Sequence, residues 1–534
     1  MHASIFNDVI GPVMRGPSSS HCAAALRIGR LARDLMDGAL EEVLVEFDRH
    51  GSLPTTHDTQ GSDMGLAGGL LGWEADDERL PDSMQHLRDA GVSIRFTIVD
   101  AGDPHPNTYR LTLRRGAETR HLRAISTGGG MIQVLNVDAF AVPMAGDCYE
   151  TLLWTHQHDP ELKRHLMAFI PGATLREHAA KGAHLMELQT DHPVPDTILG
   201  PLADRFQIHT LKHLRPVLPV LSRPGASAPF TTCAALLEYD AGRNTPLWRL
   251  AAEYEMARGG LTEAEVLARM VDLVRLLRRS IAQGIAGTQY DDRVLGHQSG
   301  RFQELMQGGR LLDGGALNRV ILYVTAIMEV KSAMGVIIAA PTAGACAALP
   351  AAVIALAEAR GLGELEMAKA MLAAGVIGIF ITTHWSFAAE EGGCQAEGGS
   401  AACMAAAALT DMAGGTLAQS VAAASMALQS MLGLICDPIA NRVEAPCLGK
   451  NVMAASNALA CANMALSGYD PLIPLDEVIE TARRVSGQMP RELRCTALGG
   501  LSITPTSKAI EERLATRKAS ACGACSCAPA LASP

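Results

Sequence analysis

Three cysteines in the C-terminal half of the chain have sequence surroundings that suit metal ligands. Cys394 follows two glycines in EEGGCQAEGGS, and Cys436 and Cys447 enclose the segment CDPIANRVEAPC. Paired glycines and Asp-Pro interrupt helices, so the thiols are predicted in loops or at helix starts, where the helix dipole stabilises thiolates. Three such thiolates could hold three irons of a [4Fe-4S] cluster and leave a fourth iron open as a Lewis acid. The spacing matches no short ferredoxin or zinc-ribbon pattern, and buried helix-end cysteines are the alternative.

Four residues just before a predicted helix at 22–36 could bind an anion. They belong to the segment GPSSSH. Hydroxyls and backbone N–H groups at a helix N-terminus form a site for a carboxylate, although the same pattern also suits an ordinary N-cap. The residues are Ser18, Ser19, Ser20 and His21.

Two further segments carry weaker signals. STGGG, at 126–130, follows a predicted strand and could form an anion-binding loop, but it lacks the spacing of a dinucleotide site. APTAGAC, at 340–346, interrupts two apolar helices, and such breaks often turn backbone groups toward a pocket.

The elements that must position these residues fall into three zones, so a multidomain fold is expected. Residues 1–138 mix helical and strand-like patterns and indicate an α+β domain. Residues 139–222 follow the order βαββαβ, which favours a ferredoxin-like module. Residues 230–514 are rich in Ala, Gly and Met and are predicted to be all-helical. Residues 515–534, small and polar, are predicted to be a flexible tail that contains cysteines.

Residue periodicity predicts individual elements within these zones. Strands are expected at 42–47, 92–99, 108–113, 121–126 and 150–155, and near residues 175, 185 and 209. Helices are expected at 61–71, 160–169, 196–205, 316–338, 365–381, 400–412, 417–434 and 450–466.

Composition excludes several classes of protein. The 534 residues carry a net charge of −11 and only 4% aromatic side chains, which disfavours nucleic-acid binding. The N-terminus shows no signal-peptide pattern, and the apolar stretches are too short or interrupted to span a bilayer. A cytoplasmic protein without a membrane partner is expected, with its 13 cysteines mostly reduced.

Taken together, these segments resemble the iron–sulfur-dependent L-serine dehydratases, also called L-serine ammonia-lyases. The resemblance covers nearly the whole chain and looks like the two-subunit form fused into one polypeptide, β-type region first and α-type region second. It implies a β-type domain at 1–138, a regulatory ACT domain at 139–222 and a [4Fe-4S] domain at 230–514. The motifs are IGPVMRGPSSSH, GSL at 51–53, HPNT at 105–108, STGGG, APTAGAC, GGCQAE, CDPIANRVEAPC and TALGGLSITPT.

The resemblance also implies a reaction, β-elimination without pyridoxal phosphate. An open iron would polarise the β-hydroxyl of an amino acid, a base would remove the α-proton, and the product would become a 2-oxo acid such as pyruvate plus ammonia. Cys394, Cys436 and Cys447 would ligate the cluster, and residues 18–21 would be catalytic. The implied substrate-binding residues are Ser52, Asp63, Thr127, Gly128, Thr342, Ala343 and Gly344.

Departures from the family pattern leave the substrate and the base open. Gln60 stands where a histidine is expected and Asp58 where a lysine is common, with His57 nearby. These changes favour either an altered substrate or drift around the site. The other departures are Glu390, which ends Ala-Ala-Glu in place of Ser-Gly-Ala, and Lys331, Asn441, Arg442 and Cys495.

Three functional hypotheses follow. The first is a homodimeric lyase acting on L-serine or a serine-like 3-hydroxy amino acid. The second is a cluster-dependent L-cysteine desulfidase, and the third is a non-catalytic iron or redox sensor.

The ACT-like module lacks a glycine in its first turn, at residues 156–160, and is expected to be degenerate. One of Cys522, Cys525 and Cys527 could fold back to cap the cluster, or the tail could be a plain appendage.

Overall fold

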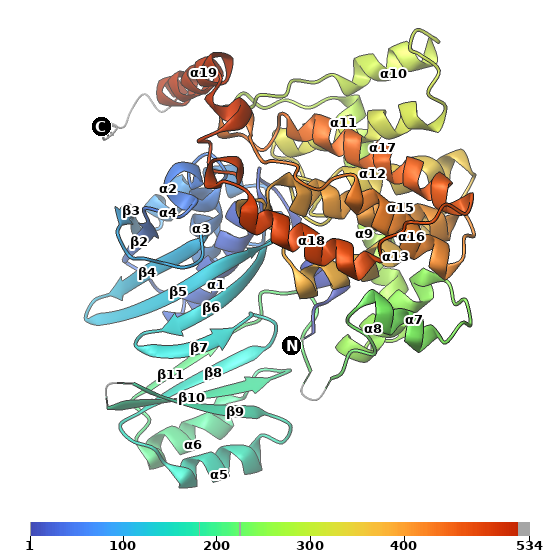
Figure 1. The fold of residues 1–534 in the computed structure, drawn as a ribbon. Helices are drawn as coiled ribbons and strands as arrows, with labels where there is room; N and C mark the ends of the chain where they lie inside the picture. Colours follow the sequence, from blue (N-terminus) through green and yellow to red (C-terminus); the bar gives the residue numbers. More distant parts are fainter. Residues whose placement is uncertain (1, 181, 224–225, 522–534) are drawn as a thin grey trace.

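The computed structural model describes residues 2–180, 182–223 and 226–521, with side chains described as far as residue 516. A mixed α+β region at the N-terminal end and a helical region at the C-terminal end pack side by side, as predicted (Figure 1). Cys522, Cys525 and Cys527 lie outside the described residues.

The N-terminal region is built on a six-stranded sheet of order β3-β2-β4-β5-β6-β7. β2 runs parallel to β3 and every other neighbouring pair is antiparallel. Alternation in β2 points Val43, Val45 and Phe47 into the core. The strands are β2 (Glu42–Asp48), β3 (Ser93–Val99), β4 (Thr108–Arg115), β5 (Glu118–Gly128), β6 (Met131–Val137) and β7 (Phe140–Met144).

Two helices in this region lie unusually close together. A Cβ atom on Gly69 would lie 2.0 Å from the backbone oxygen of Leu26, so only glycine permits this approach. The small residues of the predicted helix at 61–71 therefore serve helix packing. The helices are α1 (Ala24–Leu35) and α3 (Ser62–Leu70), accompanied by the short α2 (Leu53–Thr56) and α4 (Ser83–Asp89).

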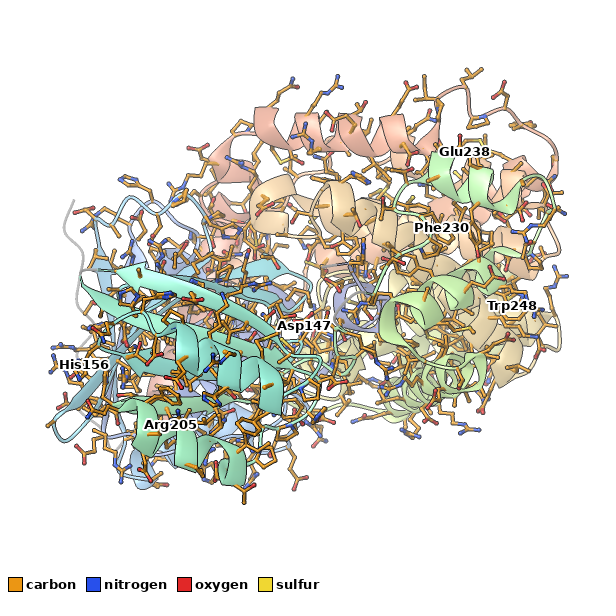
Figure 2. The ribbon with its side chains drawn as sticks, turned by 90° about the horizontal axis from the view of Figure 1, so that it is seen from below. Asp147, His156, Arg205, Phe230, Glu238 and Trp248 are labelled. Atoms are coloured by element: carbon orange, nitrogen blue, oxygen red, sulfur yellow. The ribbon has the colours of Figure 1, made fainter. Side chains whose placement is uncertain are left out.

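A second sheet follows with the βαββαβ order predicted from the sequence. Its four antiparallel strands have the order β11-β8-β10-β9, and α5 and α6 cover one face. Figure 2 shows this unit beside the helical region, with Asp147 where the two meet. The Asp147 carboxylate lies 3.8 Å from the guanidinium of Arg258 in α8 (Leu247–Gly259). The elements are β8 (Tyr149–Thr155), α5 (Pro160–Phe169), β9 (Thr174–Ala180), β10 (Ala183–Thr190), α6 (Asp196–Phe206) and β11 (Thr210–Leu214).

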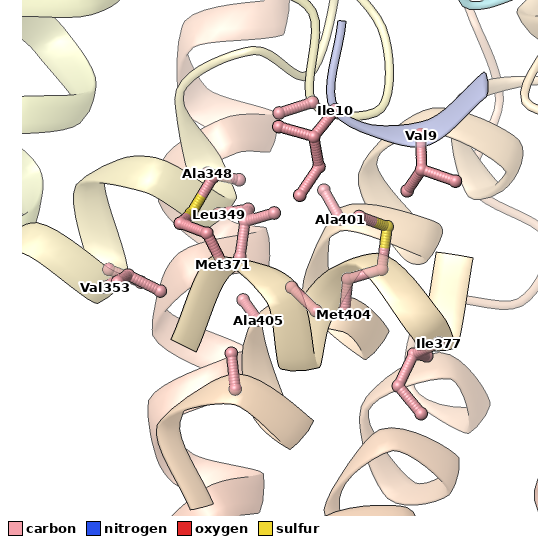
Figure 3. Close-up of a cluster of buried hydrophobic side chains, with 14 of the residues drawn as sticks. Val9, Ile10, Ala348, Leu349, Val353, Met371, Ile377, Ala401, Met404 and Ala405 are labelled. Carbon is pink, nitrogen blue, oxygen red and sulfur yellow. The ribbon is translucent and has the colours of Figure 1, made fainter. Parts of the chain in front are cut away.

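The C-terminal region is helical throughout apart from a two-residue strand, β12 (Ile337–Ile338). Its Ala-rich helices pack through small side chains around Met371, Met404 and Leu349 (Figure 3). The helices are α7 (Cys233–Asp240), α8 (Leu247–Gly259), α9 (Glu263–Ala286), α10 (Ser299–Gln307), α11 (Ala316–Ser332), α12 (Ala348–Ala359), α13 (Glu364–His384), α14 (Ala389–Gly392), α15 (Ser400–Met412), α16 (Leu417–Gln429), α17 (Cys447–Leu466), α18 (Leu475–Gln488) and α19 (Pro505–Ala521).

The sequence predicts apolar stretches too short or too interrupted to span a bilayer, and one helix differs from this expectation. α13 has 21 residues and is long and apolar enough to cross a bilayer. However, 78% of its most apolar 18-residue stretch is buried inside the protein, as is typical of a core helix.

The N-terminal segment joins the two regions. Val13 and Met14 form β1, which pairs antiparallel with β12. Val9 and Ile10 reach the helical core beside Met404 (Figure 3). A Cβ atom on Gly378 of α13 would lie 2.1 Å from Val9, so this helix has a groove for the segment. The chain's first residues therefore belong to the core of its last half.

Several element boundaries differ from the predicted ones. The helix predicted at 316–338 ends at Ser332, because Met334 takes a positive φ and residues 337–338 pair with β1. The helix predicted at 22–36 begins with a π-helical turn, Ser19–Ala23. β6 and β7 have no predicted counterpart, and the six-stranded sheet continues to Met144, beyond residue 138.

Candidate active site

The three predicted ligand cysteines come together in the helical region. Cys394 lies two residues after α14 and caps the π-helical turn Gln395–Gly399, Cys436 lies in a loop, and Cys447 is the first residue of α17. These loop and helix-start positions agree with the prediction from their neighbours. The Cys394 and Cys436 sulfurs and a Glu397 carboxylate oxygen lie within 4.8 Å of one another. Cys447 is near enough for its charge to interact with Cys394. All three thiols are at most 5% exposed.

Two lysines, the partly buried Lys450 and the buried Lys331, stand beside these thiols. The Lys450 ammonium lies 3.6 Å from the Cys394 sulfur and donates to Ile435 O and Asp437 Oδ1, both at 2.7 Å. Burial opposes its charge, but the neighbouring Cys394 and Cys436 and Asp437 raise the pKa of Lys450 overall. Lys331 is 1% exposed and donates to the Val443 carbonyl. Such cations stabilise thiolates that would otherwise be costly to bury.

The donor set suits an iron–sulfur cluster. Thiolates are the usual ligands of such clusters, and Cys447 supplies one from a helix N-terminus, which favours negative charge. Hydrogen bonding with the Cys394 and Cys495 thiols, and then burial, raise the pKa of Cys436. Burial also raises the pKa of Cys447. Without a metal the Cys436 and Cys447 thiols are therefore protonated, and binding a metal would release protons.

A chain of hydrogen bonds orients His21 close to this group. Thr56 donates its hydroxyl hydrogen to Ser52 O at 2.8 Å, so His21 Nε2, 2.7 Å from Thr56 Oγ1, must be the donor. His21 Nδ1 then accepts from Ser18 Oγ at 3.0 Å. Burial, and then the charge of His57, lower the pKa of His21 to about 3, so the ring is neutral. A neutral imidazole of fixed tautomer positions hydroxyls but does not neutralise an anion.

Glu390 is a buried carboxylate between His21 and the thiols. It lies 3.4 Å from His21 Nδ1, and its charge interacts with Cys495. Neither its Oε2 nor the Nδ2 of the buried Asn107 makes a well-formed hydrogen bond, although the Asn107 amide lies close enough to lower the pKa of this carboxyl. Burial raises the pKa of Glu390 to about 7. Buried polar atoms left unpartnered indicate groups that a ligand satisfies.

The turn at residues 340–346 contacts both the N-terminal region and the residues around the thiols. Ala343 N donates to Ser19 Oγ at 3.1 Å, and Thr342 donates its hydroxyl to Glu397 Oε1 at 2.7 Å. Asn451 of α17 fixes the turn through Gly344 O at 2.8 Å. The break between two apolar helices thus turns backbone groups toward the site, as its sequence predicted.

The remaining predicted residues take differing positions around this centre. Ser52 donates its hydroxyl to Asn107 Oδ1, beside Glu390, and Ser20 is buried in the π-helical turn. Thr127 and Gly128 contact the segment before α14, through Ser386 and Ala388. Asp63 accepts from His57 Nδ1 at 2.7 Å.

Replacing Gly344 tests this geometry. A Cβ atom there would lie 2.7 Å from Glu397 Oε1, so Gly344→Ala must push Glu397 away from Thr342. We expect kcat/KM to fall about 10-fold to 100-fold, as for small misplacements of reacting groups. Gly449→Ala on α17 is the matched control, since a Cβ there meets nothing within 4 Å. Equal kcat/KM for the two variants would show that the turn does not position the site.

Sequence reasoning missed several residues of this centre. Glu390, Gln60 and Cys495 stood out only as departures from a family pattern, and nothing in their sequence spacing brings them together. Lys450 and Glu397 carry a signal that could have found them, because each lies three residues from a predicted ligand cysteine. One helical turn places such residues next to the thiols.

The fold and this centre define a class of protein: a two-part enzyme with a buried thiol-lined site where an α+β region meets a helical bundle. Residues 242–502 match the family model "Serine dehydratase alpha chain". The chain is 37% identical to a probable L-serine dehydratase alpha chain of Bacillus subtilis over 47% of this chain and 84% of that protein. It is 40% identical to a probable beta chain of the same organism over 27% of this chain and 65% of that protein.

A single-chain relative spans both regions. An L-serine dehydratase of Streptomyces coelicolor is 27% identical over 91% of this chain and 96% of that protein. The chain therefore belongs to the L-serine dehydratase family, with alpha-like and beta-like regions in one polypeptide, and it is a lyase of the dehydratase type.

Proposed function

We propose that this protein is a [4Fe-4S]-dependent L-serine dehydratase that converts L-serine, or a closely similar 3-hydroxy amino acid, to a 2-oxo acid and ammonia. The observation that carries the proposal is the convergence of three buried thiols, two lysines and an unpartnered carboxylate on one centre. The names of the relatives, which are L-serine dehydratases, support the same substrate.

Cys394, Cys436 and Cys447 would hold the cluster, which when bound supplies a Lewis-acidic iron for the β-hydroxyl of the substrate. Ser19, the neutral His21–Ser18 pair and the backbone around Ala343 would hold the carboxylate by hydrogen bonds. This set is polar but uncharged, so it would hold the carboxylate by hydrogen bonds and not by an ion pair.

Glu390 is the residue we assign as the base. Its unpartnered Oε2 can take the α-proton, and a pKa of about 7 suits transfer near neutral pH. The Asn107 amide beside it can hold a substrate oxygen or orient the carboxylate. Loss of the α-proton and of the hydroxyl leaves an enamine, which hydrolyses to the 2-oxo acid.

A substrate panel tests this proposal. Protein purified without oxygen is expected to release ammonia and pyruvate from L-serine, with kcat/KM above that for L-cysteine or larger 3-hydroxy amino acids. The D-serine enantiomer is the matched control, because its α-hydrogen points away from a base on the same face. Faster release of sulfide from L-cysteine would instead make the protein a desulfidase, and no turnover of any substrate would favour a sensor.

For the βαββαβ unit we propose a degenerate ACT-like module with a structural role. Its first turn, which a glycine would open for a ligand, contains Asp159 instead, and this side chain caps α5 through Glu161 N and Leu162 N. Homodimerisation through this unit and a cytoplasmic location remain predictions. Calorimetry with L-serine on the full chain, compared with the Asp159→Gly variant, tests the structural role of the module. A difference in serine binding between the two proteins would contradict that role.

A further inference from the structure

A fourth cysteine, remote in sequence from the other three, lies in the thiol group. Cys495 is 3% exposed and shares a small apolar cluster with Cys394, Cys436 and Ala389. Its sulfur is within hydrogen-bonding range of the Cys436 sulfur. Two backbone bonds fix this proximity: Cys436 N donates to Leu493 O at 2.9 Å, and Cys495 N donates to Cys436 O at 3.2 Å.

The side-chain amide of Gln60, from the N-terminal region, faces the Cys495 sulfur. Asn441 Nδ2 donates to Thr55 O at 2.6 Å, so Asn441 Oδ1 must face Gln60. This orients the Gln60 amide, which donates from Nε2 to Asn441 Oδ1 at 3.0 Å and toward Cys495 Sγ at 3.5 Å. Gln60 Oε1 lies 3.7 Å from the same sulfur. N–H donors directed at cluster sulfurs are a usual means of stabilising bound thiolate.

The local charge also suits one more thiolate. The partly buried Lys450 and the buried Lys331 both lie within reach of the ligand cysteines. A buried thiolate is tolerated only where it is paired or ligated. The two ammonium groups offset negative charge that four thiolates would bring.

We propose that Cys495 is the fourth thiolate ligand of the cluster in the resting enzyme, with Gln60 as the hydrogen-bond donor to its sulfur. Ligation breaks the S–H bond of Cys495, forms an Fe–S bond and releases the proton to solvent, with no electron transfer. Serine would have to displace this thiolate before turnover. The inference rests on the proposed cluster.

Glu397 is the competing ligand, because its carboxylate is grouped with Cys394 and Cys436. However, Thr342 already donates to its Oε1, which orients the carboxylate toward the 340–346 turn. The Cys495 sulfur instead meets the Gln60 amide, at 3.5 Å from Nε2 and 3.7 Å from Oε1, and its backbone is tied to the ligand residue Cys436. The geometry therefore favours Cys495.

The test measures the stability of the fourth iron in the full chain, reconstituted with iron and sulfide without oxygen. The variants are Cys495→Ala, Cys495→Ser and Glu397→Gln, and Cys461→Ser is the control because Cys461 lies along α17 and bonds to Asn457. Under mild oxidant, the EPR signal of a three-iron cluster is expected to appear on the order of tenfold faster in Cys495→Ala than in the wild type or the control.

The outcomes separate this inference from the proposed function. Equal rates in the wild type and Cys495→Ala, with four irons bound in each, would overturn the inference and leave the cluster in place. Faster loss in Glu397→Gln alone would assign the fourth ligand to Glu397. A wild-type chain that binds no iron would overturn both the inference and the proposed function.

Discussion

Replacing Cys447 by serine is expected to abolish both iron binding and serine turnover. Cys447 is the first residue of α17, 5% exposed, where the helix N-terminus and Lys331 favour a thiolate. A Lewis-acidic metal supplies several kcal/mol to a transition state, so its loss lowers the rate by about a thousandfold or more. The measurement is iron and sulfide content beside pyruvate release, both made without oxygen.

Cys461→Ser is the matched control on the same helix. Its thiol is also buried but bonds to Asn457, so iron content and turnover are expected to stay close to wild type. A Cys447→Ser protein that keeps its full iron content and its activity would remove this cysteine from the ligand set.

Glu390→Gln is expected to give the second-largest loss, with the cluster intact. Removing a general base costs typically a hundredfold to ten-thousandfold, so we expect kcat to fall by about that range. Glutamine keeps the size of the side chain, so the buried site should fold as before. The matched control is Glu391→Gln, because the adjacent Glu391 already pairs with His105 at 2.7 Å.

The raised pKa of Glu390 predicts the pH dependence of the reaction. A base must be ionised to act, and burial raises the pKa of Glu390 to about 7. The rate is therefore expected to fall as pH drops through about 7 and to level off above it. Glu390→Asp should keep an acid limb at reduced rate, whereas Glu390→Gln should lose it. An unchanged acid limb in Glu390→Gln would assign the ionisation to another group.

Short-range patterns predicted most of the architecture. The βαββαβ order followed from local periodicity, and the helix predicted at 450–466 begins only three residues earlier, at Cys447. The strands β6 and β7 were missed although alternating apolar residues mark them, including Ile132 and Val134. The early end of α11 could not be predicted, because it depends on pairing between β12 and β1.

The candidate site was predicted only in part, for a physical reason. Motif residues such as Ser19 and Ala343 carry a family signal, yet their 3.1 Å hydrogen bond joins segments 324 residues apart. Gln60 and Cys495 meet across 435 residues, and no spacing rule reaches that far. Glu390 gains its function from burial and a missing partner, which are properties of the folded chain.

The most direct test of the account is Mössbauer spectroscopy of the reconstituted full chain, loaded with enriched iron, before and after L-serine is added. We expect a [4Fe-4S] cluster in which L-serine changes the signal of a single iron site and leaves the other three unchanged, because three cysteines keep their irons while the fourth iron exchanges its ligand. A spectrum that saturating L-serine leaves unchanged, or a chain that assembles no cluster, would contradict it.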